Sequence, residues 1–207
     1  KSLDYVEAGL PALIAERLAR ATPLRFVGGP TLVSTRATAE GARYVVQGAF
    51  ERRPDWKIAV TVQIVAADDR TRVLASVERV GAKDVVAHTG LEAAIAAFAE
   101  VDGAAPRTTA ETLSTFGRDP YAFVLYGRGI AAYVGVPGHL RGPERAREIL
   151  GRALVIDPKV PEARRYLGLV HLEAGRPGHA RAMWSYALDV RPTYVAALAA
   201  LAALDRT

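Results

Sequence analysis

The chain has 207 residues, of which 27 are basic and 22 acidic, and half of its residues are hydrophobic. This length exceeds the roughly 100 to 150 residues of a typical domain, so two folded units are expected. The formal net charge of +5 is too small to indicate a dedicated nucleic-acid surface, and the absence of cysteine excludes disulfides, thiolate metal ligands and a thiol nucleophile.

The first half of the sequence combines helical and strand patterns. Residues 3–19 carry apolar side chains near helical spacing, which predicts one amphipathic helix that Pro11 either kinks or causes to start later. The stretch 56–66 alternates apolar residues onto one face, as a half-buried strand does. In chain order we expect a helix at 3–19, a short strand at 24–27 before a Gly-Gly-Pro turn, strands at 44–50, 56–66 and 72–80, and a helix at 85–101. These elements predict an α/β unit over residues 1–103, followed by a linker at 104–118.

Three runs in this half carry a family resemblance: Leu3-Asp4-Tyr5-Val6, residues 42–50 with Gly48, and Val62-Gln63-Ile64-Val65. They resemble the small N-terminal domain of TolB-type translocation proteins and of related envelope lipoproteins and accessory regions of cyclases or regulators. The resemblance implies an α+β fold with a helix, a three- to four-stranded mixed sheet and a second helix. That family has an apolar strand before its first helix, and nothing precedes Lys1 here. We therefore expect this strand to be removed or supplied by another chain, which leaves an open sheet edge able to recruit a neighbour.

A sequence repeat marks the second half. The run Ala153-Leu154-Val155-Ile156-Asp157-Pro158 returns as Ala187-Leu188-Asp189-Val190-Arg191-Pro192, so the two prolines lie 34 positions apart. Between them stand a Leu-Gly step, small residues and an aromatic residue, and this half resembles the tetratricopeptide repeat, an all-α array of helical hairpins. In such hairpins small residues allow close helix approach and large ones fill the space between the helices. The residues assigned to this packing are Gly127, Ala146, Ala153, Leu167, Gly168, Ala180, Trp184 and Ala187.

The earlier copy of the repeat has a longer turn. Gly127 and Ala146 are 19 positions apart, whereas Gly168 and Ala180 are 12 apart, which predicts an inserted loop at 134–143. The predicted array covers residues 119–207, with hairpins at about 119–158 and 159–192 and a single helix at 193–205. That last helix is nearly all Ala and Leu, so we expect it to dock back onto the molecule, to meet a second copy, or to be followed by more chain. Homo-oligomerisation through this helix or the open sheet edge is a hypothesis.

No motif in the sequence predicts catalysis or metal binding. Gly127-Arg128-Gly129 fits a loose dinucleotide-binding pattern, but it falls inside a predicted helix, where close helix packing is the better interpretation. None of the histidines has the spacing of metal ligands; they are His88, His139, His171 and His179. We therefore expect no catalytic residue, no metal and no cofactor.

The tetratricopeptide resemblance also implies a binding surface, because the first helices of successive hairpins line a concave groove in that family. It assigns to this groove Tyr121, Val124, Arg128, Glu162, Arg165, Leu169 and Leu172. Arginine pairs with carboxylates, and leucine and valine accept apolar side chains, so this set suits an extended peptide. The alternative is that the charged members only solvate an open helical face.

We interpret the chain as a non-enzymatic protein-binding module of a bacterial envelope or signalling protein, located in the periplasm or at the envelope. One rival is the regulatory region of a larger adenylate cyclase or transcription regulator, for which the cytoplasm is the alternative location. A second rival is an independent enzyme with a deep polar pocket. The expected partner is a protein or peptide and not nucleic acid, and no run of 18 apolar residues predicts a membrane span.

Overall fold

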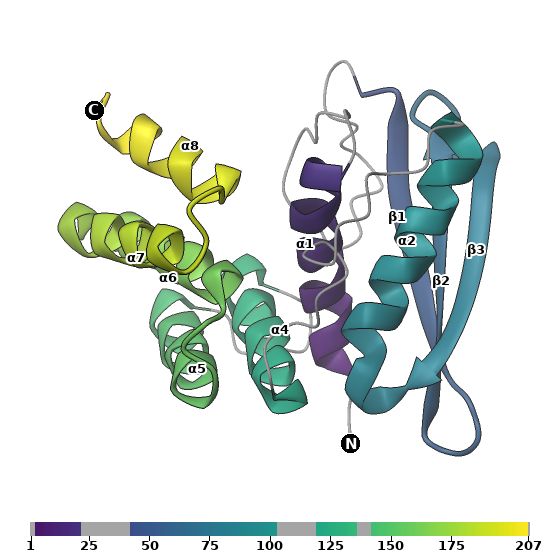
Figure 1. The fold of residues 1–207 in the computed structure, drawn as a ribbon, viewed down its shortest axis with the longest axis horizontal. Helices are drawn as coiled ribbons and strands as arrows, with labels where there is room; N and C mark the ends of the chain where they lie inside the picture. Colours follow the sequence, from purple (N-terminus) through teal and green to yellow (C-terminus); the bar gives the residue numbers. More distant parts are fainter. Residues whose placement is uncertain (1–2, 22–41, 103–118, 136–141, 207) are drawn as a thin grey trace. The chain divides into compact units, whose positions relative to one another are not determined.

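The computed structural model describes residues 3–21, 42–102, 119–135 and 142–206, and its fold is drawn in Figure 1. The elements are, in chain order, α1 (Asp4–Ala21), β1 (Tyr44–Arg52), β2 (Lys57–Ala66), β3 (Val73–Ala82), the short 3-10 helix η1 (Lys83–Val85), α2 (Val86–Asp102), α4 (Pro120–Val134), α5 (Pro143–Ile156), α6 (Pro161–Glu173), α7 (Pro177–Val190) and α8 (Val195–Leu204). They belong to two compact units, one of Lys1–Gly9 with Phe116–Thr207 and the other of Leu10–Thr115.

The unit Leu10–Thr115 contains, in its described residues, a meander of three antiparallel strands in the order β1-β2-β3. Gly48 of β1 pairs with Val62 of β2, which in turn pairs with Val77 of β3. Helix α2 lies along β2 and β3 (Figure 1). Because one face of the sheet is covered in this way, alternate residues of β2 such as Ile58, Val62 and Ile64 are buried.

The three predicted strands and the helix after them are confirmed to within two residues at each end. The expected mixed sheet differs from the sheet described, in which every strand pairing is antiparallel. The predicted strand at 24–27, the turn after it and the linker at 104–118 lie outside the described residues.

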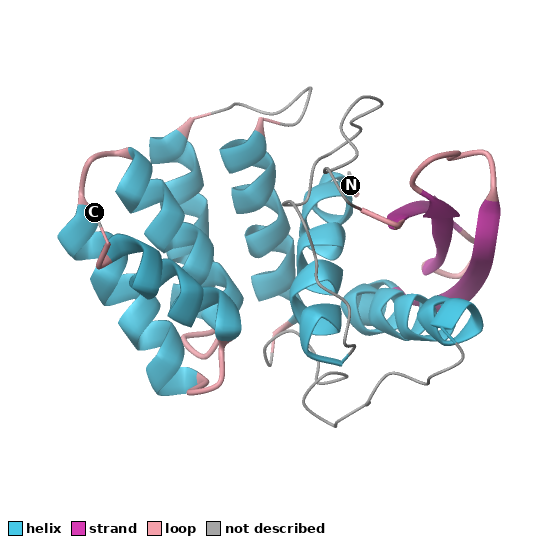
Figure 2. Cartoon of the chain, turned by 90° about the horizontal axis from the view of Figure 1, so that it is seen from above, coloured by secondary structure: helices cyan, strands magenta, loops and turns pink. Residues whose placement is uncertain are grey.

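The helices α4 to α8 pack in chain order, each against the next, and α4 also contacts α6. Figure 2 shows this succession of helices from a second direction. Proline stands at the start of α4, α5, α6 and α7, where its fixed φ suits the first helical turn and its missing N–H removes no hydrogen bond. The first of these starts is further fixed by Asp119, whose carboxylate accepts a hydrogen bond from the backbone N–H of Tyr121 at 2.7 Å.

The helix boundaries repeat at a fixed interval. Helices α5 and α7 begin at Pro143 and Pro177, and α6 and α8 begin at Pro161 and Val195, so both pairs are offset by 34 positions. The interval between the starts of α4 and α6 is 41 positions, which is seven longer. The extra residues fall at the predicted inserted loop 134–143, of which 136–141 lie outside the described residues.

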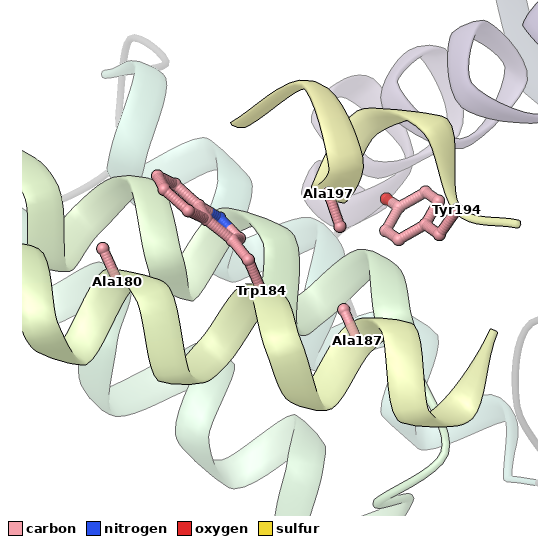
Figure 3. Close-up of a cluster of buried hydrophobic side chains, with 5 residues drawn as sticks. All are labelled: Ala180, Trp184, Ala187, Tyr194 and Ala197. Atoms are coloured by element: carbon pink, nitrogen blue, oxygen red, sulfur yellow. The ribbon is translucent and has the colours of Figure 1, made fainter. Parts of the chain in front are cut away.

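Helix α8 packs against α7, so the last predicted helix docks onto the molecule on one side. Its Ala197 and the preceding Tyr194 form a buried cluster with residues of α7. Figure 3 shows the members of this cluster, which are Ala180, Trp184, Ala187, Tyr194 and Ala197. On the other side of α8 Val195 and Leu198 are exposed. None of the helices in the described parts of the chain has both the length and the apolar character that a membrane crossing requires.

The start of α1 packs against α4 within the unit Lys1–Gly9 with Phe116–Thr207. The rings of Tyr5 and Phe123 meet edge to face with centroids 5.9 Å apart. A Cβ atom added at Gly127 would lie 2.0 Å from the carbonyl oxygen of Tyr5, and one added at Gly9 would lie 2.8 Å from the Cα of Gly127. These two helices therefore approach so closely at Gly9 and Gly127 that neither position accepts a side chain.

Candidate functional site

The residues assigned to helix packing decide which faces of α4 and α6 remain accessible. All eight of them are buried; they are Gly127, Ala146, Ala153, Leu167, Gly168, Ala180, Trp184 and Ala187. Trp184 of α7 lies against Gly168 of α6, and its indole N–H donates a hydrogen bond to the carbonyl oxygen of Arg165 at 3.1 Å. Arg165 stands three positions before Gly168 and Leu172 four positions after it, so both border the side of α6 that faces α7.

The predicted groove residues of α4 and α6 are mostly accessible. Tyr121 and Leu172 are exposed. Half-buried side chains accompany them on both helices, and these are Val124, Arg128, Arg165 and Leu169. The structure thus presents one exposed apolar or aromatic residue, one half-buried aliphatic residue and one half-buried arginine on each of the two helices.

Glu162 is the exception among the predicted groove residues. Its side chain is only 1 % exposed and accepts a 2.8 Å charged hydrogen bond from Arg191, itself 12 % exposed, just beyond α7. The guanidinium of Arg191 also lies over the ring of Tyr194, 5.4 Å from its centroid. Glu162 therefore fastens the start of α6 to the connection between α7 and α8, and its carboxylate is not presented to a partner. The two ionic partners are 29 positions apart, and no periodic signal in the sequence predicts their pairing.

Aromatic contacts hold α4 and α6 at a fixed spacing. The ring of Tyr166 on α6 meets both Tyr126 and Tyr133 of α4 edge to face, with centroids 6.0 and 6.1 Å apart. The hydroxyl of Tyr133 donates a 2.5 Å hydrogen bond to the carboxylate of Glu173. Burial, followed by this hydrogen bond, raises the pKa of Tyr133 well above its usual range, so the phenol stays protonated as a donor. The guanidinium of Arg165 lies over the Tyr166 ring at 4.8 Å, which orients that arginine on α6.

Two histidines meet across the turn between α6 and α7. The rings of His171 and His179 stack at a centroid distance of 5.2 Å. His171 is buried, and its Nδ1 has no hydrogen-bond partner among the described residues. Burial first, and the nearby His179 second, lower the pKa of His171 below its usual range, so the ring is held neutral. No group of three or more His, Cys, Asp or Glu side chains in the described residues is arranged to hold a metal ion.

The structure shows two glycine packing contacts that were not predicted from the sequence. Gly129 of α4 faces α5, where an added Cβ would lie 2.6 Å from the Cγ of Leu150. Gly127, which was assigned to packing within the hairpin, faces the backbone of Tyr5 in α1. Both glycines lie inside α4 and not at its start, a position unlike that of the glycines in a phosphate-binding loop.

The accessible residues of α4 and those of α6 offer guanidinium donors, an aromatic ring and aliphatic side chains on helices. Such groups bind acidic and apolar side chains of a partner. Comparison with protein-family models, with curated proteins and with solved structures gave no match.

Proposed function

We propose that the chain is a protein-binding module whose helices from Pro120 onward form a tetratricopeptide-type array that binds an extended peptide of a partner along α4 and α6. The offset of 34 positions between equivalent helix starts supports the repeat assignment. The glycine and tryptophan contact between α6 and α7 supports the hairpin packing that the repeat pattern implies.

The accessible residues Tyr121, Val124 and Arg128 of α4 and Arg165, Leu169 and Leu172 of α6 are the observation that carries the proposal, in which they form one peptide row. None of these side chains is fully buried, whereas most other apolar residues of the two helices are; Tyr133 and Val134 at the end of α4 are half-buried. Large apolar side chains left exposed on a rigid helical scaffold are typical of a binding surface. The two arginines give the row a positive charge, since Glu162 is withdrawn by its buried ion pair with Arg191.

Charge reversal in this row tests the proposal. Arg128→Glu combined with Arg165→Glu is expected to abolish binding to an array of immobilised peptides that contain carboxylate and aliphatic side chains. The matched control is Arg152→Glu combined with Arg206→Glu, which changes the net charge equally at exposed positions outside the row. Circular dichroism verifies that both variants keep their helices. Equal peptide binding by the native chain and the Arg128 and Arg165 variant would contradict the proposed groove.

A further inference from the structure

The turn between β1 and β2 has an unusual backbone. Asp55 and Trp56 have φ values of 60° and 61°, and they are the described non-glycine residues with positive φ. They occupy the centre of a tight turn in which the N–H of Lys57 donates to the carbonyl of Pro54 at 3.4 Å and the N–H of Arg53 donates to the carbonyl of Lys57 at 3.0 Å. Positive φ at both central residues suits the twist of a hairpin, but glycine is the residue that adopts it without strain. An aromatic residue in this conformation is disfavoured by its own Cβ.

Folding of the sheet does not account for the tryptophan at this position. The side chain of Trp56 is 77 % exposed, whereas the chain's other tryptophan, Trp184, is 1 % exposed. Trp56 therefore contributes little to a core and retains a strained backbone. A residue that strains the backbone and adds no core packing indicates a role in function and not in folding.

The base of the turn is held in place by ionic contacts. The guanidinium of Arg53 lies 3.3 Å from the carboxylate of Glu51 on β1 and 3.4 Å from that of Glu78 on β3. The turn is the loop that joins β1 to β2 in Figure 1. Since Arg53 at the base of the turn contacts carboxylates of both β1 and β3, the indole is presented on a restrained support, which lowers the entropy lost when it is bound.

The charges around the turn distinguish between kinds of partner. At this end of the sheet the basic residues are Arg52, Arg53, Lys57, Arg79 and Lys83, and the acidic residues are Glu51, Asp55, Glu78 and Asp84. Five basic against four acidic residues do not make a positive field, which an anionic membrane or a nucleic acid would need for attraction. An aromatic residue surrounded by charges of both signs instead matches the anchors of protein interfaces, which insert into an apolar pocket within a polar rim.

We propose that the turn Pro54–Lys57 is a docking element whose Trp56 inserts into an apolar pocket of a folded protein partner. The element lies on the unit Leu10–Thr115 and depends on a different observation from the peptide row on α4 and α6. Its partner carries a pocket of indole size with a rim of mixed charge.

The experiment places the photoreactive residue p-benzoylphenylalanine at position 56 of the full chain, with exposed Val73 at the start of β3 as the matched control position. Irradiation in an extract of the source cells is expected to give a protein adduct from position 56 that is missing from position 73. The captured protein is then purified, and Trp56→Gly is expected to weaken its affinity about 100-fold. Glycine accepts the positive φ, so this loss would not come from a distorted turn. Arg128→Glu combined with Arg165→Glu is expected to leave the affinity unchanged, which separates this contact from the peptide row.

Four results would overturn the proposal. They are the absence of an adduct, an affinity that Trp56→Gly leaves unchanged, an adduct of twice the chain mass, and membrane insertion of the indole. The third would identify a second copy of the chain as the occupant. The fourth is measured in Trp184→Phe, where Trp56 is the remaining tryptophan, as a blue shift of its emission on vesicles of phosphatidylcholine and phosphatidylglycerol.

Discussion

Substitution of Gly168 by alanine tests the packing that joins α6 to α7. A Cβ atom at this position would lie 2.1 Å from the Nε1 of Trp184 and 2.6 Å from its Cδ1. The indole has no room to withdraw, because it is 1 % exposed and its N–H is bonded to the carbonyl of Arg165. The two helices must therefore separate, or the indole must rotate and lose its hydrogen bond.

The expected loss follows from three opposing contributions. Overpacking of a well-packed core costs about 1 to 3 kcal/mol, and loss of the indole hydrogen bond costs about 1 kcal/mol. Alanine gains about 1 kcal/mol over glycine in a helix interior. Gly168→Ala is therefore expected to lower the free energy of unfolding by about 1 to 3 kcal/mol, measured by urea denaturation with circular dichroism at 222 nm.

Gly151 of α5 provides the matched control, because an added Cβ there would meet nothing within 4 Å. Gly151→Ala is expected to raise the free energy of unfolding by up to about 1 kcal/mol, through helix propensity alone. A stability of Gly168→Ala equal to or above that of the native chain would refute the close contact at Trp184. Equal losses at the two glycines would refute the distinction between them.

Three further predictions concern the turn, the histidine pair and the buried ion pair. Trp56→Gly is expected to raise the free energy of unfolding by roughly 0.5 to 1 kcal/mol in urea denaturation. Relief of about 1 to 2 kcal/mol of backbone strain exceeds the free-energy cost of the extra entropy that glycine gives the unfolded chain. A lower free energy of unfolding would contradict the strain at Trp56. The pKa of His171 in the folded chain lies below its ordinary value of 6.5, so the unfolded chain binds this proton more readily. The contribution of His171 to the free energy of unfolding should therefore be complete above pH 6.5 and decrease as the pH falls below 6.5. The urea midpoint should lose this slope in His171→Phe but keep most of it in His179→Gln, and an unchanged slope in the first variant would exclude His171 as its source. Glu162→Ala should lower the free energy of unfolding by about 3 to 5 kcal/mol in the same assay, because it leaves Arg191 buried without its carboxylate. Replacement of Glu162 by Leu together with Arg191 by Met should cost less, and equal costs of the two variants would exclude the unpaired charge of Arg191 as the source of the loss.

The strands and the repeat interval could be predicted because both recur periodically along the sequence. Strand β2 alternates apolar residues every second position, and this period alone places Ile58 and Ile64 on the covered face. The recurrence of Pro158 at Pro192 gave the interval of 34 positions that the helix starts of α5 to α8 also show. Such signals are periodic in the sequence, so they can be found without knowledge of the three-dimensional contacts.

Contacts that join distant residues gave no comparable signal. Glu162 was assigned to an accessible groove because its position in the first helix resembles that of groove residues, yet Arg191 reaches it from beyond the next helix. The positive φ of Trp56 was equally hidden, since sequence preference places glycine or asparagine at such a position. In both cases a tertiary constraint overrides the preference of the residue type.

The two glycines of α4 show how well a repeat pattern predicts which residues of neighbouring helices are in contact. Trp184 and Leu150 each follow a buried alanine by four positions, so they stand at equivalent places in α7 and α5, whose starts are 34 positions apart. Trp184 packs against Gly168, and Leu150 packs against Gly129, two residues beyond the glycine that the pattern assigned to this contact. The starts of α4 and α5 are seven positions further apart than those of α6 and α7, and the glycine in contact differs between the two pairs. Gly127 is then used for the approach of α1, and one helix carries two glycine contacts on two of its faces.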